Sequence, residues 1–315
     1  MKQIPSVAAM KAACRQITRS GRTLGLVPTM GALHEGHLSL ARASKARCDV
    51  TAVSVFVNPL QFGPTEDLDK YPRDLARDAA MLEKAGVDLL FAPTVDEMYG
   101  PTLSPRDGEK AGAPTRDGKT YVIVEGLSGK LDGASRPGHF RGVTTVVTKL
   151  FEIVRPDCAF FGQKDAAQVA VLRKMVRDLD MDVEVVVCPI FREPDGLAMS
   201  SRNIYLTPEQ RRQALVLHRA LMRVQLAADQ GESDAAKLVE IGKQVIAEEP
   251  GARLDYFAIV DADTLDPIAE IDSRPSRKTA GTGHPSGDER TSHAVLVAVA
   301  AYVGTTRLID NILLT

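Results

Sequence analysis

Two histidines stand three residues apart at a point where the sequence predicts that a buried strand turns into a helix. Leu24–Val27 is an apolar run typical of a buried strand, and Leu38–Arg47 has the character of a helix. His34 and His37 lie between them, and their spacing places both side chains on one helix face. A helix N-terminus attracts anions, phosphates above all. The spacing therefore predicts a polyphosphate site with two imidazole donors.

Several residues around this histidine pair are small, and the spacing of the pair also raises the question of a metal site. Gly31, Ala32 and Gly36 would let a ligand approach the backbone closely. Histidines at i and i+3 can also share a metal ion, but the zinc-protease pattern H-E-x-x-H needs one more residue between its histidines. No cluster of cysteines or carboxylates offers a third ligand, so we expect no metal held by protein side chains.

A second candidate stretch, Gly162-Gln163-Lys164-Asp165, follows another predicted strand and opens a helix. In a doubly wound sheet, ligands bind outside the carboxyl ends of the strands. Lys164 can offer its charge to phosphates, and Asp165 can accept hydrogen bonds from ribose hydroxyls. A plain turn with an aspartate that caps a helix remains the alternative.

A third candidate stretch, Leu197–Asn203, combines two hydroxyls, a guanidinium and an amide. Ser200, Ser201 and Arg202 together have the composition of a phosphate clamp. The alternative is an ordinary solvated loop, and this stretch alone does not decide between the two.

The elements that position these stretches alternate between strand and helix. We predict strands at Leu24–Val27, Val50–Val57, Val87–Ala92, Asp157–Phe161 and Val183–Val187, with a short one at Tyr121–Glu125, and helices at 6–20, Leu38–Arg47, Pro72–Ala85, Val143–Val154 and Ala166–Leu179. Residues 100–120 and 126–141 are expected to be loops, because glycine and proline interrupt them. The alternation predicts an α/β fold with a doubly wound, Rossmann-like parallel sheet.

The pattern changes near residue 190, where we place a domain boundary. Residues 1–190 would form the nucleotide-binding domain. Residues 191–315 would form a smaller α+β domain that carries the Met199–Arg202 loop and acts as a lid. Its predicted elements are helices at Glu209–Asp229 and Ser233–Glu248, strands at Leu254–Val260 and His293–Tyr302, and a mobile loop at Asp272–Ser292.

Composition and charge exclude several classes of protein. The 315 residues carry 39 basic and 41 acidic side chains, so no overall basic field points to nucleic acid. No apolar run approaches the length of a membrane span, and no secretory signal is recognisable at the N-terminus. The four cysteines are scattered and form no C-x-x-C pair, which is typical of free thiols in a reducing compartment. We therefore expect a cytoplasmic protein without membrane or nucleic-acid partners.

Taken together, the motifs resemble those of a known family. His34-Glu35-Gly36-His37 is similar to the His-x-Gly-His signature of class I synthetases and related nucleotidyltransferases, and Met199-Ser200-Ser201-Arg202 to their Lys-Met-Ser-Lys-Ser loop. More closely, five stretches resemble the pantothenate synthetase family: Pro28–His37, Phe56–Phe62, Arg136–Val143, Gly162–Asp165 and Met199–Asn203. The resemblance extends in order over nearly the whole chain, to Asp310-Asn311.

This resemblance implies an activity and a set of site residues. The family joins (R)-pantoate to β-alanine with ATP, through pantoyl adenylate, and forms pantothenate, AMP and pyrophosphate. It implies Mg²⁺ held mainly by the phosphates, and a homodimer. The catalytic residues would be His34, His37, Lys164 and Arg202. The ATP site would comprise Met30, Gly31, His34, His37, Gly162, Gln163, Lys164, Asp165, Phe191, Met199, Ser200, Ser201 and Arg202. The pantoate and β-alanine site would comprise Pro28, Met30, Asn58, Gln61 and Gln168.

The sequence departs from the family pattern at a few positions. The family usually has Glu at Gln163 and an aromatic residue followed by Gln at Ala166 and Ala167, and loops 100–120 and 272–292 look longer than usual. Two rival functions remain open: an adenylate-forming enzyme for a different acid, and a nucleotide sensor without catalysis. The amides of Gln61 and Gln168 favour pantoate, and the full set of phosphate-binding groups favours an enzyme.

Overall fold

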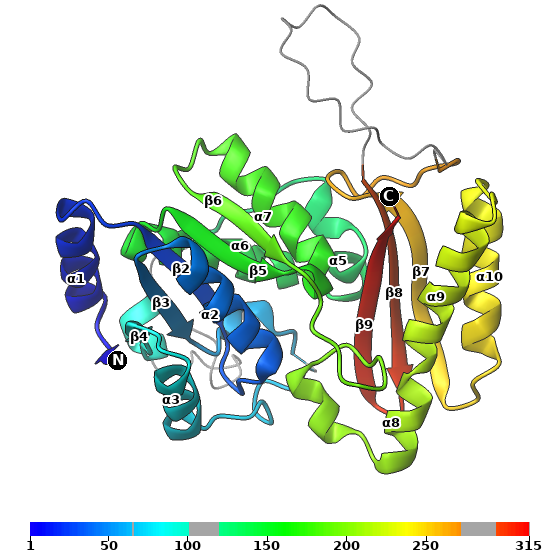
Figure 1. Ribbon diagram of the computed structural model, residues 1–315, viewed down its shortest axis with the longest axis horizontal. Helices are drawn as coiled ribbons and strands as arrows, with labels where there is room; N and C mark the ends of the chain where they lie inside the picture. The colour runs from blue at the N-terminus through cyan, green and yellow to red at the C-terminus, as the bar shows by residue number, and fades with distance from the viewer. Residues whose placement is uncertain (65, 101–119, 272–293, 315) are drawn as a thin grey trace, which may run out of the picture. The chain divides into compact units, whose positions relative to one another are not determined.

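A six-stranded parallel sheet forms the centre of the N-terminal part of the chain. In the computed structural model (Figure 1), residues 1–64, 66–100, 120–271 and 294–314 are described. The strands are β1 (Lys2–Ile4), β2 (Leu24–Thr29), β3 (Val50–Val55), β4 (Leu89–Phe91), β5 (Cys158–Gly162) and β6 (Glu184–Cys188). Their order is β1-β4-β3-β2-β5-β6, with every pair parallel. The order reverses between β2 and β5, so the ligand-binding crevice of a doubly wound fold belongs at their carboxyl ends.

Helices cover both faces of this sheet. Helices α2 (Glu35–Arg47) and α3 (Leu75–Lys84) contact each other on one face, whereas α1 (Val7–Arg19), α6 (His139–Val154) and α7 (Ala166–Asp178) form a contiguous layer on the other (Figure 1). The remaining helical segments are α4 (Val95–Tyr99), α5 (Asp132–Ser135) and the 3₁₀ turns η1 (Pro59–Gln61), η2 (Leu127–Gly129), η3 (Gln163–Asp165) and η4 (Ser201–Tyr205). The strands are apolar on both faces because both faces are covered.

The core on the α2 side is built from alternate strand residues. Val27, Val53 and Phe160 are fully buried and pack in one cluster with Leu38 and Ala41 of α2. Strand side chains alternate between the two faces with a period of two, so each strand contributes every second residue to this cluster. The register between β2 and β3, in which Leu24 pairs with Val50, aligns these core residues on neighbouring strands.

The C-terminal part of the chain forms a second compact unit. It contains helices α8 (Pro208–Ala214), α9 (Val216–Asp229) and α10 (Ala235–Ala247), and an antiparallel sheet of β7 (Ala252–Asp261), β8 (Val295–Val303) and β9 (Thr306–Leu314). Helices α9 and α10 pack on this sheet, and Leu221, Leu238 and Val299 are fully buried in its core. The expectation of a smaller α+β domain is confirmed.

The division into units differs from the expected boundary in one respect. The first unit comprises Met1–Glu193 together with Ala198–Asn203, and the second comprises Pro194–Leu197 and Ile204–Thr315. The predicted phosphate loop, Met199–Arg202, therefore belongs with the first unit and not with the second. Hydrogen bonds explain this placement: Arg202 pairs with Asp67, and Ser201 contacts Tyr71. The role of the second unit as a lid stays a prediction.

Several predicted elements are wrong or incomplete. Tyr121–Glu125 is not a strand: the backbone of Val122 bonds to the hydroxyls of Thr144 and Thr145 in α6, and no strand among the described residues pairs with it. The stretch expected to be a loop up to residue 141 contains η2, α5 and the start of α6. The helix predicted at Glu209–Asp229 is divided at Leu215 into α8 and α9.

Strands β1 and β9 and helix α4 were not predicted. The first strand is only three residues long, and Arg307, Asp310 and Asn311 interrupt the apolar alternation of β9. The expected loops at 100–120 and 272–292 fall almost entirely outside the described residues. Within the part of the chain that is described, no helix combines the length and apolar character needed to cross a bilayer.

We expect the packing of α10 on β7 to depend on the absence of a side chain at Gly242. A β-carbon there would lie 2.2 Å from the ring of Phe257, which is closer than atoms can pack. Glycine-to-alanine exchange within a helix ordinarily stabilises by about 0.5–1 kcal/mol, whereas overpacking costs about 1–3 kcal/mol. Gly242→Ala should therefore lower the free energy of unfolding measured with urea. Gly129→Ala is the control, because its β-carbon would meet no atom within 4 Å; equal effects of the two changes would contradict this packing.

Candidate active site

Three backbone amides in the turn between β2 and α2 have hydrogen-bond partners inside the protein. The backbone N–H of Gly31 is bonded to the hydroxyl of Thr29, and those of Ala32 and Leu33 are bonded to the carboxylate of Asp78. The sequence suggested that backbone N–H groups at this helix start would face a phosphate. These three amides already have partners, so the groups that line the cavity here are the imidazoles and Gly36 of the first helical turn.

The two imidazoles lie against each other at the first turn of α2. Their ring centroids are 4.0 Å apart, and the backbone N–H of His34 donates to Nδ1 of His37 at 3.4 Å. Nδ1 of His37 is therefore an acceptor, and the proton of the neutral ring resides on Nε2. Nδ1 of His34 is buried and has no hydrogen-bond partner in the described structure.

Both rings are neutral at physiological pH. Burial, followed by the positive charge of Lys164, lowers the pKa of His34 from 6.5 to about 4. Burial, followed by the effects of His34 and Lys164, lowers the pKa of His37 to about 3. Neutral imidazoles can donate hydrogen bonds to an anion without carrying charge. The pair therefore suits a site that stabilises charge as it develops, and is poorly suited to supplying a proton.

The end of β5 brings a lysine and an aspartate to the same cavity. Lys164 and Asp165 lie in η3, and Lys164 Nζ is 3.9 Å from a carboxylate oxygen of Asp165. Both side chains line the cavity that contains His34 and His37. The predicted meeting of the β2 and β5 ends is therefore present in the structure.

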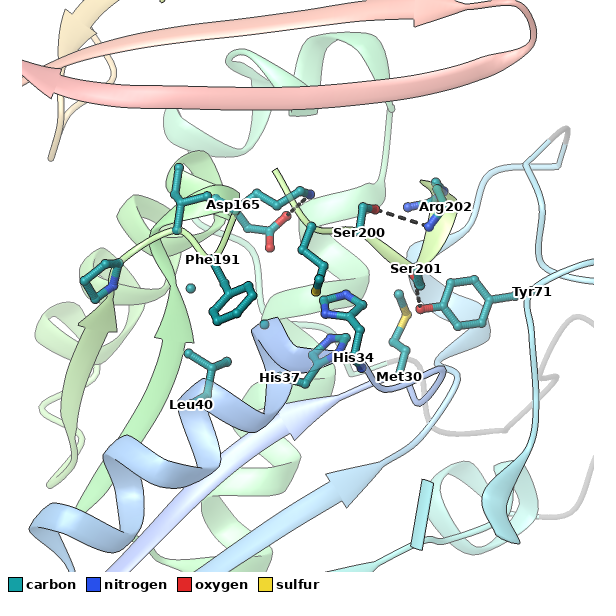
Figure 2. Close-up of a pocket in the computed structure, with 16 residues that line it drawn as sticks. Met30, His34, His37, Leu40, Tyr71, Asp165, Phe191, Ser200, Ser201 and Arg202 are labelled. Atoms are coloured by element: carbon teal, nitrogen blue, oxygen red, sulfur yellow. Dashed lines mark hydrogen bonds and ion pairs between the residues drawn. The ribbon is translucent and has the colours of Figure 1, made fainter. Parts of the chain in front are cut away.

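The Ser200–Arg202 segment closes the opposite wall of this cavity. Figure 2 shows the two imidazoles between the Phe191 segment and the segment that carries Ser200, Ser201 and Arg202. The hydroxyl of Ser201 lies 3.2 Å from that of Tyr71. The backbone N–H of Met199 donates to the carbonyl of Phe191 at 3.0 Å, which ties the two segments together.

Arg202 is held by a carboxylate through two hydrogen bonds. Its Nε and one terminal nitrogen donate to Asp67 at 3.0 and 2.9 Å. Burial alone would raise the pKa of Asp67, but these bonds and the charge of Arg202 lower it below its usual value. A paired guanidinium keeps its remaining N–H groups for a ligand and has a fixed direction.

A second cavity adjoins the first and is lined on one side by apolar residues. The two share Met30, His37, Tyr71, Asp165 and Arg202. The second cavity is also lined by the predicted residues Pro28, Gln61 and Gln168, and by a row of apolar side chains: Val143, Val146, Val147, Leu150 and Phe161. A cavity lined by both amides and apolar side chains suits a small, branched, hydroxylated acid.

Asn58 lies behind this cavity and does not line it. Its side chain is buried, donates to Gln61 Oε1 and to the carbonyl of Gly142 at 3.1 Å each, and accepts from the hydroxyl of Tyr99 at 2.8 Å. A β-carbon at Gly142 would lie 2.2 Å from the carbonyl of Leu60, so glycine is required where α6 meets η1. In this structure Asn58 orients Gln61, whose Nε2 contacts the sulfur of Met30 at 3.0 Å.

A chain of charged and polar groups supports Gln61 from its backbone side. Arg136 donates to both oxygens of Glu66, at 2.9 and 2.6 Å. His139 lies between Arg136 and the carbonyl of Gln61, at 3.0 and 2.8 Å. Because that carbonyl only accepts, Nδ1 of His139 is the donor and Nε2 accepts from Arg136. Burial, followed by the charge of Arg136, lowers the pKa of His139 to about 4, which agrees with a neutral ring.

The structure thus brings together most of the predicted residues and leaves a few outside. Gly31 and Gln163 line neither cavity, and neither do the two family departures Ala166 and Ala167. The residues that we missed are Tyr71, Arg136 and His139. Arg136 and His139 belong to the stretch Arg136–Val143, which resembles the family pattern but to which we had assigned no site residue. Tyr71 carried no local signal, because it reaches the cavity only through folding.

Fold and site together define an α/β enzyme of the nucleotide-binding type, and its candidate site stands at the switch point of a doubly wound sheet. The family model for pantoate-beta-alanine ligase matches residues 2–313. The pantothenate synthetase of Koribacter versatilis is 55% identical over 314 residues, which cover 100% of this chain and 96% of that protein. The pantothenate synthetase of Acetivibrio thermocellus is 50% identical over 313 residues, with 99% of each chain covered.

Solved structures agree with this assignment. The crystal structure of pantothenate synthetase from Thermus thermophilus aligns with a TM-score of 0.82 at 44% identity, over 99% of both chains. The structure of the ligase from Francisella tularensis, complexed with an ATP species and β-alanine, aligns with a TM-score of 0.72 at 29% identity, over 99% of this chain and 97% of that one. The chain belongs to the pantoate-beta-alanine ligase family. It is a ligase that condenses pantoate with β-alanine at the expense of ATP.

The low pKa values of the buried histidines give a testable pH dependence. His34, His37 and His139 have folded-state pKa values of about 4, 3 and 4, below the unfolded value of about 6.5. Between these limits the unfolded chain binds more protons, so the free energy of unfolding falls as the pH drops from about 6.5 toward 4. NMR titration of the imidazole Cε1–H signals should show that these rings do not titrate between about pH 5.5 and 8. Midpoints near the ordinary histidine value would contradict the neutral pair.

Proposed function

We propose that the triphosphate of ATP lies across the first cavity, between the imidazoles and the Ser200–Arg202 segment. The observation that carries this proposal is the placement of His34, His37 and Lys164 in one cavity with the Ser200–Arg202 segment. Neutral imidazole N–H groups and hydroxyls supply directed donors, and Lys164 and Arg202 supply charge. The adenine would lie at Phe191 and Gly162, and Asp165 would accept from the ribose.

Pantoate would occupy the second cavity, with its gem-dimethyl group against Pro28 and Met30 and its polar groups on Gln61 and Gln168. Because His37, Asp165 and Arg202 line both cavities, an acid in the second lies next to a nucleotide in the first. A pantoate carboxylate oxygen attacks the α-phosphorus, the bond to the β-phosphate breaks, and pyrophosphate leaves. The amine of β-alanine then attacks the acyl carbon of the adenylate, loses a proton and releases AMP.

The protein contributes to this sequence mainly by position and electrostatics. Holding the reactants in line supplies most of the rate enhancement, because neither step needs a covalent bond between substrate and enzyme. His34 and His37 are placed to donate to oxygens on which negative charge builds during the first step. Their low pKa values favour this role over that of a general acid.

Magnesium would be held chiefly by the phosphates of the nucleotide. The described residues include no group of three or more metal-ligating side chains that could form a cage for the ion. Mg²⁺ usually keeps several waters and binds through substrate phosphates with few protein ligands. When bound, the ion neutralises phosphate charge.

The proposal extends to the location and the oligomeric state of the protein. The cytoplasmic location is supported by Cys14, Cys48, Cys158 and Cys188, which are free and buried, as is usual in a reducing compartment. The homodimer is proposed from the family resemblance alone.

Replacing His37 with alanine tests the phosphate role. Loss of one preorganised donor typically costs about 2.7–4 kcal/mol in the transition state, so His37→Ala should slow adenylate formation roughly 10²–10³-fold. The measurement is pantoate-dependent exchange of pyrophosphate into ATP without β-alanine. Arg42→Ala, an exposed change on the same helix, is the control. Exchange at the parental rate in His37→Ala would show that His37 does not stabilise the phosphates during adenylate formation.

Replacing Gln61 tests the assignment of the second cavity to pantoate. Gln61→Ala removes the amide that would pair with the acid's hydroxyls, at a cost of about 1–3 kcal/mol. It touches none of the phosphate-binding groups. We expect a KM for pantoate raised about 5- to 150-fold, with the affinity for ATP nearly unchanged. If titration shows weaker ATP binding and an unaltered pantoate dependence, the second cavity does not hold the acid.

A further inference from the structure

The backbone turn before the histidines is strained. Gly31 has φ 83° and Ala32 has φ 50°, so two successive residues adopt left-handed conformations. An alanine rarely does so, and such residues persist only where their surroundings fix them. A turn of this kind needs an external restraint on its amides.

One carboxylate supplies that restraint. Asp78 accepts from the N–H of Ala32 through Oδ2 and from the N–H of Leu33 through Oδ1, each at 2.9 Å. A β-carbon on Gly31 would lie 2.9 Å from Oδ2, so the glycine lets the carboxylate approach. The two bonds bracket the strained alanine and use both oxygens of the carboxylate.

Asp78 is itself firmly placed. It lies on α3 and is 1% exposed, with the guanidinium of Arg77 at 3.8 Å as its nearest ion partner. Its neighbours Ala79 and Leu82 pack in the same core cluster as Leu33. The restraint on the turn is therefore anchored in the hydrophobic core.

The turn leads directly to the histidine pair. The residue after Leu33 is His34, and its N–H is the group that donates to Nδ1 of His37. That bond keeps Nδ1 unprotonated and leaves the proton on Nε2. A shift of the Leu33–His34 peptide would break the bond and allow the other tautomer.

We propose that Asp78 is a positioning residue that fixes the tautomer of His37 through this turn. Its carboxylate holds the left-handed backbone so that the N–H of His34 selects the Nε2–H form of the His37 ring. Asp78 lines neither substrate cavity, so it acts through the turn and not on the substrates. Its effect on rate rests on the proposed role of His37 as a phosphate donor.

The test compares two aspartates at α3. Asp78→Asn replaces one carboxylate oxygen with an NH₂ group, which cannot accept from an amide. We expect adenylate formation to slow at least about tenfold, with the KM for ATP changed less than about threefold. We also expect the ¹⁵N spectrum of His37 to change from one tautomer to a mixture. Asp74→Ala is the matched control: Asp74 caps the same helix by accepting from the N–H of Arg77 at 2.9 Å and has no bond to the turn.

The control separates positioning from stability. Asp74→Ala should lower the melting temperature, yet keep the parental rate and the single tautomer. A parental rate and tautomer in Asp78→Asn would overturn the proposal, and so would rate losses in both variants that follow only their stability. If Asp78→Asn does not fold, the wild-type protein decides: ¹⁵N NMR must show Nδ1 of His37 unprotonated, and couplings must connect the Ala32 and Leu33 amides to the Asp78 carboxylate.

These outcomes are distinct from failure of the phosphate role. If His37→Ala keeps its exchange activity while Asp78→Asn still changes the tautomer, the function assigned to His37 is wrong and the positioning by Asp78 stands. If His37→Ala loses activity while Asp78→Asn leaves the tautomer intact, the function assigned to His37 stands and the positioning by Asp78 is wrong.

Discussion

The pairing of β2 with β5 determines where the functional groups of this enzyme lie. Gly25 pairs with Cys158 and Leu26 with Ala159, so the two strands run side by side and end at one edge of the sheet. The chain leaves β2 through the turn that carries the histidines and leaves β5 through Lys164. Residues far apart in the sequence therefore lie close together, and no long side chain is needed to bring their functional groups into one cavity.

Charge in the cavities is balanced before any substrate binds. The two imidazoles are neutral, Arg202 is paired with Asp67, and Arg136 is paired with Glu66. Adjacent carboxylates in one loop thus hold two arginines that face the cavities. Paired guanidiniums are already oriented, so an incoming anion meets fixed donors whose ordering requires little further entropy.

The sequence predicted much of this arrangement, and the failures have physical causes. The alternating apolar strands of the first unit and the three stretches that meet in the first cavity were predictable, because periodicity and turn residues are local signals. The strand prediction for Tyr121–Glu125 was wrong because hydroxyls of α6 side chains, and not a neighbouring strand, bond to the backbone of Val122. The roles of Tyr71 and Asp78 were not predicted, because they arise from contacts with residues far away in the chain. Tyr71 contacts Ser201, and Asp78 contacts the Ala32 and Leu33 amides. The assignment of Asn58 to substrate contact overlooked that it could act through Gln61.

The course of the chain around residues 193–204 has a consequence for dissecting the molecule. The backbone leaves the first unit after Glu193, returns to it for Ala198–Asn203 and leaves again. A cut after Glu193 would separate Ser200, Ser201 and Arg202 from the histidines, whereas a cut after Asn203 keeps them together and removes only Pro194–Leu197 from the second unit. A truncation that keeps the candidate site in one piece therefore has to end after Asn203 and not at the first point where the chain leaves the unit. For the same reason, a genetic fusion or circular permutation should not open the chain between residues 193 and 203.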